Sequence, residues 1–78
     1  MRYSMSFSDW RERIEVLEFE AASDSSALKA AHRLLSEQKR IFRADHPRAR
    51  VREGWYVLWI VLNVDSGETV YTRPRSDR

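Results

Sequence analysis

Two stretches in the first third of the chain alternate polar and apolar residues, as half-buried β-strands do. In the first, which predicts a strand over residues 2–7, arginine and serine alternate with three large apolar residues, Tyr3, Met5 and Phe7. The second stretch predicts a strand over residues 13–21. Its apolar residues change phase between Val16 and Leu17, which indicates a bulge or burial on both faces.

A helix is expected to follow these strands. Residues 23–26 read Ser-Asp-Ser-Ser, and such side chains cap the unpaired amides of a first helical turn. The apolar residues beyond them have the three-four spacing of one helical stripe and stand at positions 27, 28, 31, 34, 35, 41 and 42. The helix should end at His46, because Pro47 disfavours helical geometry in the residue before it.

The second half of the chain has the pattern of extended structure. Residues 48–52 alternate arginine with alanine and valine, which fits either a short strand or an extended linker. Gly54 interrupts this segment. Residues 55–64 are then strongly β-prone and predict the central strand of the sheet.

A hairpin completes the predicted fold. Residues 65–67, Asp-Ser-Gly, provide the turn, residues 69–73 the last strand, and residues 74–78 a frayed tail. The order strand-strand-helix-strand-strand, with short connections, predicts a single α+β domain over residues 1–78. In this two-layer fold, one helix packs on one face of an antiparallel sheet of four or five strands.

The strand predicted over residues 55–64 is apolar on both faces. We expect the helix to cover the face of the even-numbered residues, Tyr56, Leu58, Ile60, Leu62 and Val64. The other face would then be an exposed patch suited to an interface, formed by Trp55, Val57, Trp59 and Val61. Trp10, in the first loop, is a further candidate for an exposed aromatic. The alternative is that the sheet curls, or that the N-terminal segment folds over this face.

Composition favours a small protein of the cell interior. The 78 residues are 42% apolar, enough for one modest core, and include no cysteine for disulfides. The first residues lack the continuous apolar stretch of a signal peptide, and the longest apolar run, residues 55–62, is too short for a membrane span. We therefore expect a cytoplasmic protein with no membrane contact.

Residues for catalysis are scarce. His32 and His46 are the only histidines, and Gly54 and Gly67 the only glycines, so the chain has no phosphate-cradling glycine loop. His32 stands four residues before Ser36, but no acid at a matching spacing would orient it. We predict a protein that is not an enzyme and that needs no cofactor or metal.

Positive charge is concentrated in the second half of the chain. Residues 1–37 contain five Lys and Arg against seven Asp and Glu, whereas residues 38–78 contain nine against five. Between residues 38 and 52, one acid, Asp45, stands among six cations: Lys39, Arg40, Arg43, Arg48, Arg50 and Arg52. Such a cluster produces a positive potential that favours phosphate or an acidic protein.

The predicted helix also carries a basic ridge. Its residues follow a four-three-four-three spacing opposite the apolar stripe and are Lys29, Arg33, Ser36, Arg40 and Arg43. One interpretation is a solvated helix face without a partner. The other is a surface that follows a phosphate backbone, extended by the arginine ladder of residues 48–52.

Part of the sequence resembles a known family. The segment Phe19-Glu20-Ala21-Ala22-Ser23 closes a predicted strand before a helix rich in alanine and basic residues, and a tryptophan-bearing strand and an Asp-x-Gly hairpin follow. Over roughly residues 14–72, this order resembles the small phage-encoded anti-CRISPR proteins that bind the type I Cascade surveillance complex. Identity is confined to the Glu-Ala-Ala-Ser stretch and to scattered positions.

The resemblance implies a helix packed on an antiparallel sheet that docks on the Cascade backbone subunits in the cytoplasm of a bacterial host. Docking along the groove for guide RNA and target DNA would inhibit by occlusion, and some members also recruit duplex DNA nonspecifically. Lys29 falls near a helix lysine of that family and would contact DNA or the backbone. The longer N-terminus and the many arginines after the helix depart from the family pattern.

The leading hypothesis is accordingly an anti-CRISPR inhibitor of type I Cascade, acting through Lys29 and the other cations and through Trp55 and Trp59. An alternative is a small nucleic-acid-binding regulator whose arginines contact phosphates directly. A third is a homodimeric interaction module whose tryptophan faces pair with each other. The partners expected are thus Cascade subunits, duplex DNA or a second copy of the chain.

Overall fold

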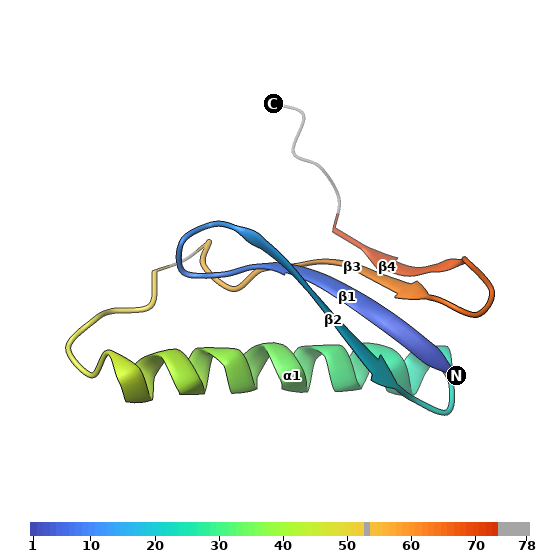
Figure 1. Cartoon of the computed structure of the whole chain (residues 1–78), viewed down its shortest axis with the longest axis horizontal. Helices are drawn as coiled ribbons and strands as arrows, with labels where there is room; N and C mark the ends of the chain where they lie inside the picture. Colours follow the sequence, from blue (N-terminus) through green and yellow to red (C-terminus); the bar gives the residue numbers. More distant parts are fainter. Residues whose placement is uncertain (53, 74–78) are drawn as a thin grey trace.

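A computed structural model, which describes residues 1–52 and 54–73, has the predicted α+β architecture (Figure 1). Strands β1 (Arg2–Ser8) and β2 (Ile14–Glu20) precede helix α1 (Asp24–Asp45), and strands β3 (Leu58–Asn63) and β4 (Thr69–Thr72) follow it. The strands form one antiparallel sheet in the order β2-β1-β3-β4. The helix lies along one face of this sheet and packs against β1, β3 and β4 (Figure 1).

Strand β1 forms the centre of the core, as its alternation predicts. Tyr3, Met5 and Phe7 are buried to 1% exposure or less, while the serines between them point to the other face. In β2, which forms one edge of the sheet, Phe19 and Leu17 pair with Tyr3 and Met5 and are half-buried. The β1 side chains therefore connect the edge strand to the layer under the helix.

Helix α1 begins with a reciprocal capping box. Ser26 donates its amide to the Ser23 Oγ at 3.3 Å, and the Ser23 amide donates to the Ser26 Oγ at 3.0 Å. The helix ends as predicted, with the amide of His46 donating to the Phe42 carbonyl at 2.8 Å just before Pro47. Its side chains in the core are Ala27, Ala31, Leu35 and Phe42.

The predicted apolar stripe is wrong at one position. Ile41 is 46% exposed. At 100° per residue it lies at the rim of the face that buries Leu35 and Phe42, so the helix contacts the sheet over a narrower arc than the apolar residues occupy.

The predicted faces of the third strand are right for Tyr56 and Leu58, which belong to the core, and wrong from Ile60 onward. Val61 (0% exposed) and Asn63 (6%) lie under the helix with the β1 core, whereas Ile60 is 42% exposed on the other face. The cause is a bulge: Ser6 pairs with Ile60 but Phe7 pairs with Leu58, which leaves Trp59 unpaired and returns Leu58 to the core.

The predicted strand also begins three residues too early. Gly54 (φ +96°) and Tyr56 (φ +54°) have left-handed backbone conformations, so residues 54–57 form an irregular turn before β3. Residues 48–52 form no strand either, and the linker interpretation holds. The sheet consequently has four described strands, and the predicted tail, residues 74–78, lies outside the described residues.

The face of the sheet away from the helix has its own apolar residues. Val16 and Ile14 are each 61% exposed, and together with Ile60 they replace the tryptophan patch that the sequence predicts. Trp55, expected on this side, instead packs on the helix side with its ring 5.6 Å from that of Phe42. Trp10 is half-buried against Phe42 and His46 rather than exposed.

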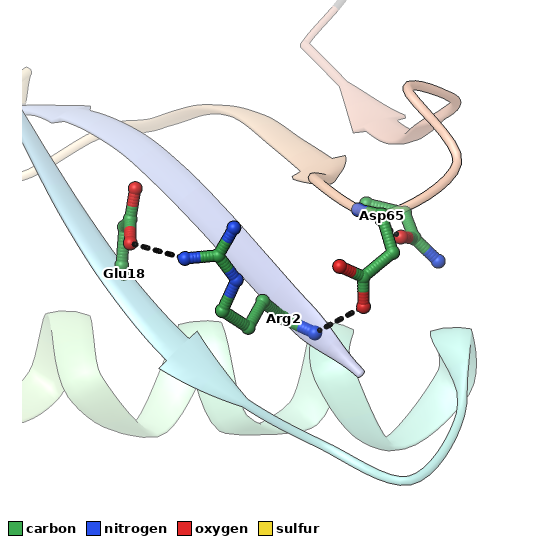
Figure 2. A network of polar contacts seen from close by, with 4 residues as sticks. Arg2, Glu18 and Asp65 are labelled. Atoms are coloured by element: carbon green, nitrogen blue, oxygen red, sulfur yellow. Dashed lines mark hydrogen bonds and ion pairs between the residues drawn. The ribbon is translucent and has the colours of Figure 1, made fainter.

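Polar contacts connect β1 to both neighbouring strands near the start of the chain (Figure 2). The amide of Arg2 donates to the Asp65 carboxylate in the β3-β4 turn at 3.0 Å, and its guanidinium lies 3.9 Å from Glu18 of β2. Because both side chains of this ion pair are exposed, it contributes at most about 1 kcal/mol.

The predicted hairpin turn is confirmed: Asn63 Oδ1 accepts from the Asp65 amide, and Gly67 has φ +79°.

In the described part of the chain, no helix has the length and apolar character needed to cross a bilayer.

Candidate anion-binding groove

The basic ridge predicted on α1 is present, but one of its cations is neutralised by an acidic residue of the same helix. Lys29, Arg33 and Arg40 are exposed on the side of the helix away from the buried residues, whereas Arg43, which is also exposed, lies on the flank of the helix. Arg40, however, forms an ion pair with Glu37 one turn earlier, and this carboxylate raises the pKa of Arg40. The ridge therefore lacks a continuous row of unpaired charges.

The arginines after the helix do not form a ladder. Arg48 and Arg50 are exposed in the irregular connection between α1 and β3, and the alternation that a strand would impose on them is missing. Arg52, at the end of the same connection, is also exposed but turns back toward the helix side of the sheet, where it lines a groove.

This groove, of about 670 Å³, opens between the C-terminal half of α1, the connection after it and strand β4. Four cations of the described chain line it: Lys39 and Arg43 from the helix, Arg52 from the connection, and Arg73 after β4. None of the described residues that line it is acidic. Cations brought together from three segments, with no acidic side chain among the described lining residues, create a concave site of positive potential.

The rest of the groove wall is apolar and aromatic. Leu35 of the helix and Leu58 of β3 belong to the core, and they meet Trp55 and Tyr71 at the groove. The ring of Trp55 stands edge-on to Phe42, at 86° between planes, and Tyr71 lies 6.3 Å from the ring of His32. Both aromatics are half-buried, so each is held by the fold and still contributes to the groove.

Trp59 packs against a groove cation instead of lining the groove itself. It is not among the residues that line the groove, and its ring lies 5.5 Å from the Arg73 guanidinium. The Arg73 amide also donates to the Trp59 carbonyl at 2.8 Å. Trp59 therefore contacts a groove cation through both its ring and its backbone carbonyl. Its indole Nε1 is buried and has no hydrogen-bond partner among the described residues.

The structure thus divides the predicted site. The groove gathers Lys39, Arg43, Arg52 and Trp55, whereas the remaining residues lie elsewhere: Lys29, Arg33, Arg40, Arg48, Arg50 and Trp59. Sequence reasoning missed Tyr71, Arg73 and His32. Alternate residues of a strand share a face, so the pair Tyr71 and Arg73 was a detectable signal once the last strand had been assigned.

A second, smaller cleft shares Tyr56 with the groove but carries acids. This acidic cleft is lined by Asp9, Glu15 and Asp45, beside Trp10 and Phe42. A hydrogen bond with Asp9, then burial, raises the pKa of Glu15, and the same hydrogen bond is the main cause of the lowered pKa of Asp9. Burial, followed by the charges of Asp9 and Glu15, raises the pKa of the Tyr56 phenol.

Among the described residues, no group of three or more His, Cys, Asp or Glu side chains is placed so that it could hold a metal ion. Comparisons with protein-family models, curated proteins and solved structures gave no match. The resemblance to the anti-CRISPR proteins therefore stays a prediction. The arrangement of charge and aromatic surface in the groove is the basis for assigning a function.

Proposed function

We propose that this chain is a non-catalytic binding domain that holds nucleic acid in the basic groove. The observation that carries the proposal is the meeting of Lys39, Arg43, Arg52 and Arg73 in one concave site whose described lining has no acid. Such a site is suited to a chain of phosphates, because each neutralised phosphate releases condensed counterions and so adds to affinity.

The groove is a better candidate than the helix ridge. On the ridge, Glu37 already pairs with Arg40, so a phosphate there would compete with an existing partner. In the groove, neither a described ion pair nor a described hydrogen bond occupies the side chains of Lys39, Arg43 or Arg52. Among the described residues, the Arg73 guanidinium contacts the Trp59 ring and forms no ion pair, so its N–H groups can donate to phosphate oxygens.

Matched charge reversals test this proposal. The groove variant is Arg43→Glu with Arg52→Glu, and the control is Arg48→Glu with Arg50→Glu, which changes net charge equally at exposed positions outside the groove. Binding of a fluorescent oligonucleotide is measured by anisotropy across a salt series. We expect the groove variant to lose at least about tenfold in affinity and about two units of the salt slope, and the control to lose much less.

Two results would contradict the proposal. Absence of binding by the unmodified protein at low salt would remove the function itself. Equal losses in the two variants would show that net charge alone attracts the nucleic acid and that the groove has no special part.

Inhibition of type I Cascade is a second candidate, favoured by one observation. The element order that the resemblance implies is present, and the Phe19–Ser23 segment leads from β2 directly into the α1 cap. A fold alone does not carry a function, so this candidate depends on a direct test. Purified Cascade should retain the protein in a pull-down, and no retention at micromolar concentration would eliminate it.

The homodimer hypothesis loses its stated basis. Its tryptophan faces do not exist as one surface, because Trp55 packs beside Phe42 on the helix side and Trp59 lies against Arg73. Light scattering after size exclusion would still report a dimer formed by other residues.

A further inference from the structure

The aromatic residues of the groove have geometry beyond what phosphate binding needs. Trp55 is fixed by its edge-on contact with Phe42, 5.6 Å between ring centres, and Tyr71 by its contact with His32. Each is half-buried and each lines the same groove as the cations, with Trp55 near Arg52 in sequence and Tyr71 near Arg73. Partly buried aromatic rings in a positive groove are the features that bind unstacked bases.

We propose, resting on the function proposed above, that the groove takes single-stranded rather than duplex nucleic acid. Bases stack on Trp55 and Tyr71, while the phosphates between them contact the cations on the two sides of the groove. Every base has a π-face, so such stacking tolerates many sequences. The domain is accordingly a low-specificity binder of single strands.

The position of the cations disfavours a duplex. A duplex presents its phosphates on a convex outer surface and hides the faces of its bases, so it is gripped by cations that protrude. Here, Lys39 is half-buried and Arg43 shares a concave wall with it, next to apolar Leu35. Apolar surface of this kind can pack against bases but offers no favourable contact to phosphates. The protruding surface, the helix ridge, is the one that Glu37 partly neutralises.

The groove is short. Its helix wall runs from His32 to Arg43, which corresponds to about 16 Å at 1.5 Å per residue. A wall of this length accommodates only a few nucleotides, about four, at the lower limit of the site sizes known for compact single-strand binders. For oligomers longer than the site, affinity should therefore rise only in proportion to the number of registers in which the strand can occupy the groove.

The test uses the full chain and three fluorescent probes of equal length: oligothymidylate, a duplex, and a single strand of abasic sugar-phosphate. We expect oligothymidylate to bind at least about tenfold more tightly than either of the others at the same salt concentration. Tyr71→Leu should weaken oligothymidylate binding by about 5- to 100-fold, and Tyr71→Phe, which keeps the ring, should bind nearly as the parent does. Thermal unfolding of both variants verifies that the sheet is intact.

The outcomes separate the two proposals. If the duplex or the abasic strand binds as tightly as oligothymidylate, base stacking is refuted while a phosphate-binding groove stands. If Tyr71→Leu and Tyr71→Phe bind alike, Tyr71 does not stack. If none of the probes binds in a salt-dependent manner, the proposed function fails and this inference fails with it.

Discussion

The basic groove and the acidic cleft share Tyr56 and depend on the same helix, yet they carry opposite charge. The groove brings together Lys39, Arg43, Arg52 and Arg73, whereas the acidic cleft brings together Asp9, Glu15 and Asp45. The net charge of only +2 therefore hides a strong separation. What distinguishes the two regions is where the fold places charge, because local potential decides which ligand approaches.

The groove and the acidic cleft, by contrast, are packed against the same buried side chain, that of Phe42. Phe42 lies between Trp10 at the acidic cleft and Trp55 at the groove, with ring centres 5.4 Å and 5.6 Å away, and Tyr56 packs beside it. One buried ring thus supports an aromatic residue of each region. A change at Phe42 should affect both clefts, and a change in either group of charges only one.

The largest effect is expected from Phe42→Ala. The side chain is 5% exposed and contacts four aromatic rings, those of Trp10, His46, Trp55 and Tyr56, so its removal should lower the free energy of unfolding by about 3 to 5 kcal/mol. Urea unfolding measures this change. The matched control is Ile41→Ala on the neighbouring helix position, which is 46% exposed and should cost much less. Similar losses in the two variants would show that Phe42 does not support the aromatic residues of the groove and the acidic cleft.

The order of elements and the helix could be predicted from the sequence because their signals are local. The Ser23 cap, the break at Pro47 and the alternation of β1 each depend on a few adjacent residues. The faces of β3 could not be predicted in this way. The bulge at Trp59 is set by the pairing with β1, more than fifty residues earlier in the chain, and it reverses the alternation that the segment alone indicates.

The candidate site was predicted in part for the same reason. The density of positive charge along the sequence identified Lys39, Arg43 and Arg52 as candidates. Helical spacing, however, grouped Arg43 with the ridge on α1. Its actual neighbours come from the connection and from β4, so only the tertiary fold brings Arg73 to it. Spacing along one helix cannot show that Glu37, rather than a ligand, holds Arg40.

A smaller effect is expected on the acidic side from Asp9→Ala. Asp9 is 7% exposed, and its Oδ1 accepts from the amides of Arg11 at 2.8 Å and Arg13 at 3.0 Å. Losing this acceptor leaves amides of the β1-β2 turn unpaired, which should cost about 1 to 3 kcal/mol in unfolding by urea. Asp9→Asn keeps an oxygen acceptor and should retain most of the stability. If both variants lose the same amount, the charge of Asp9 matters more than its hydrogen bonds.

The smallest effect is expected from Glu15→Gln, and it depends on pH. The pKa of Glu15 is raised in the folded state, so the stability it contributes is present in acid and is lost as pH rises through that folded pKa. The pKa of Asp9 is lowered, so its own contribution is present at neutral pH and is lost only as pH falls through its folded pKa. At neutral pH the parent therefore holds two adjacent carboxylates, and a glutamine at position 15 would replace repulsion by an N–H donor.

Glu15→Gln should accordingly raise the melting temperature slightly near pH 7, and this gain should shrink as the pH falls through the raised folded pKa of Glu15, where the parent's carboxylate takes up its proton. Glu20→Gln, on the same strand and exposed, is the control and should change little at either pH. Nucleic-acid binding should stay as in the parent, because Glu15 does not line the groove. A lower melting temperature near pH 7 would show that Glu15 stabilises the turn as an anion, and a change in binding would show that the two clefts are not electrostatically separate.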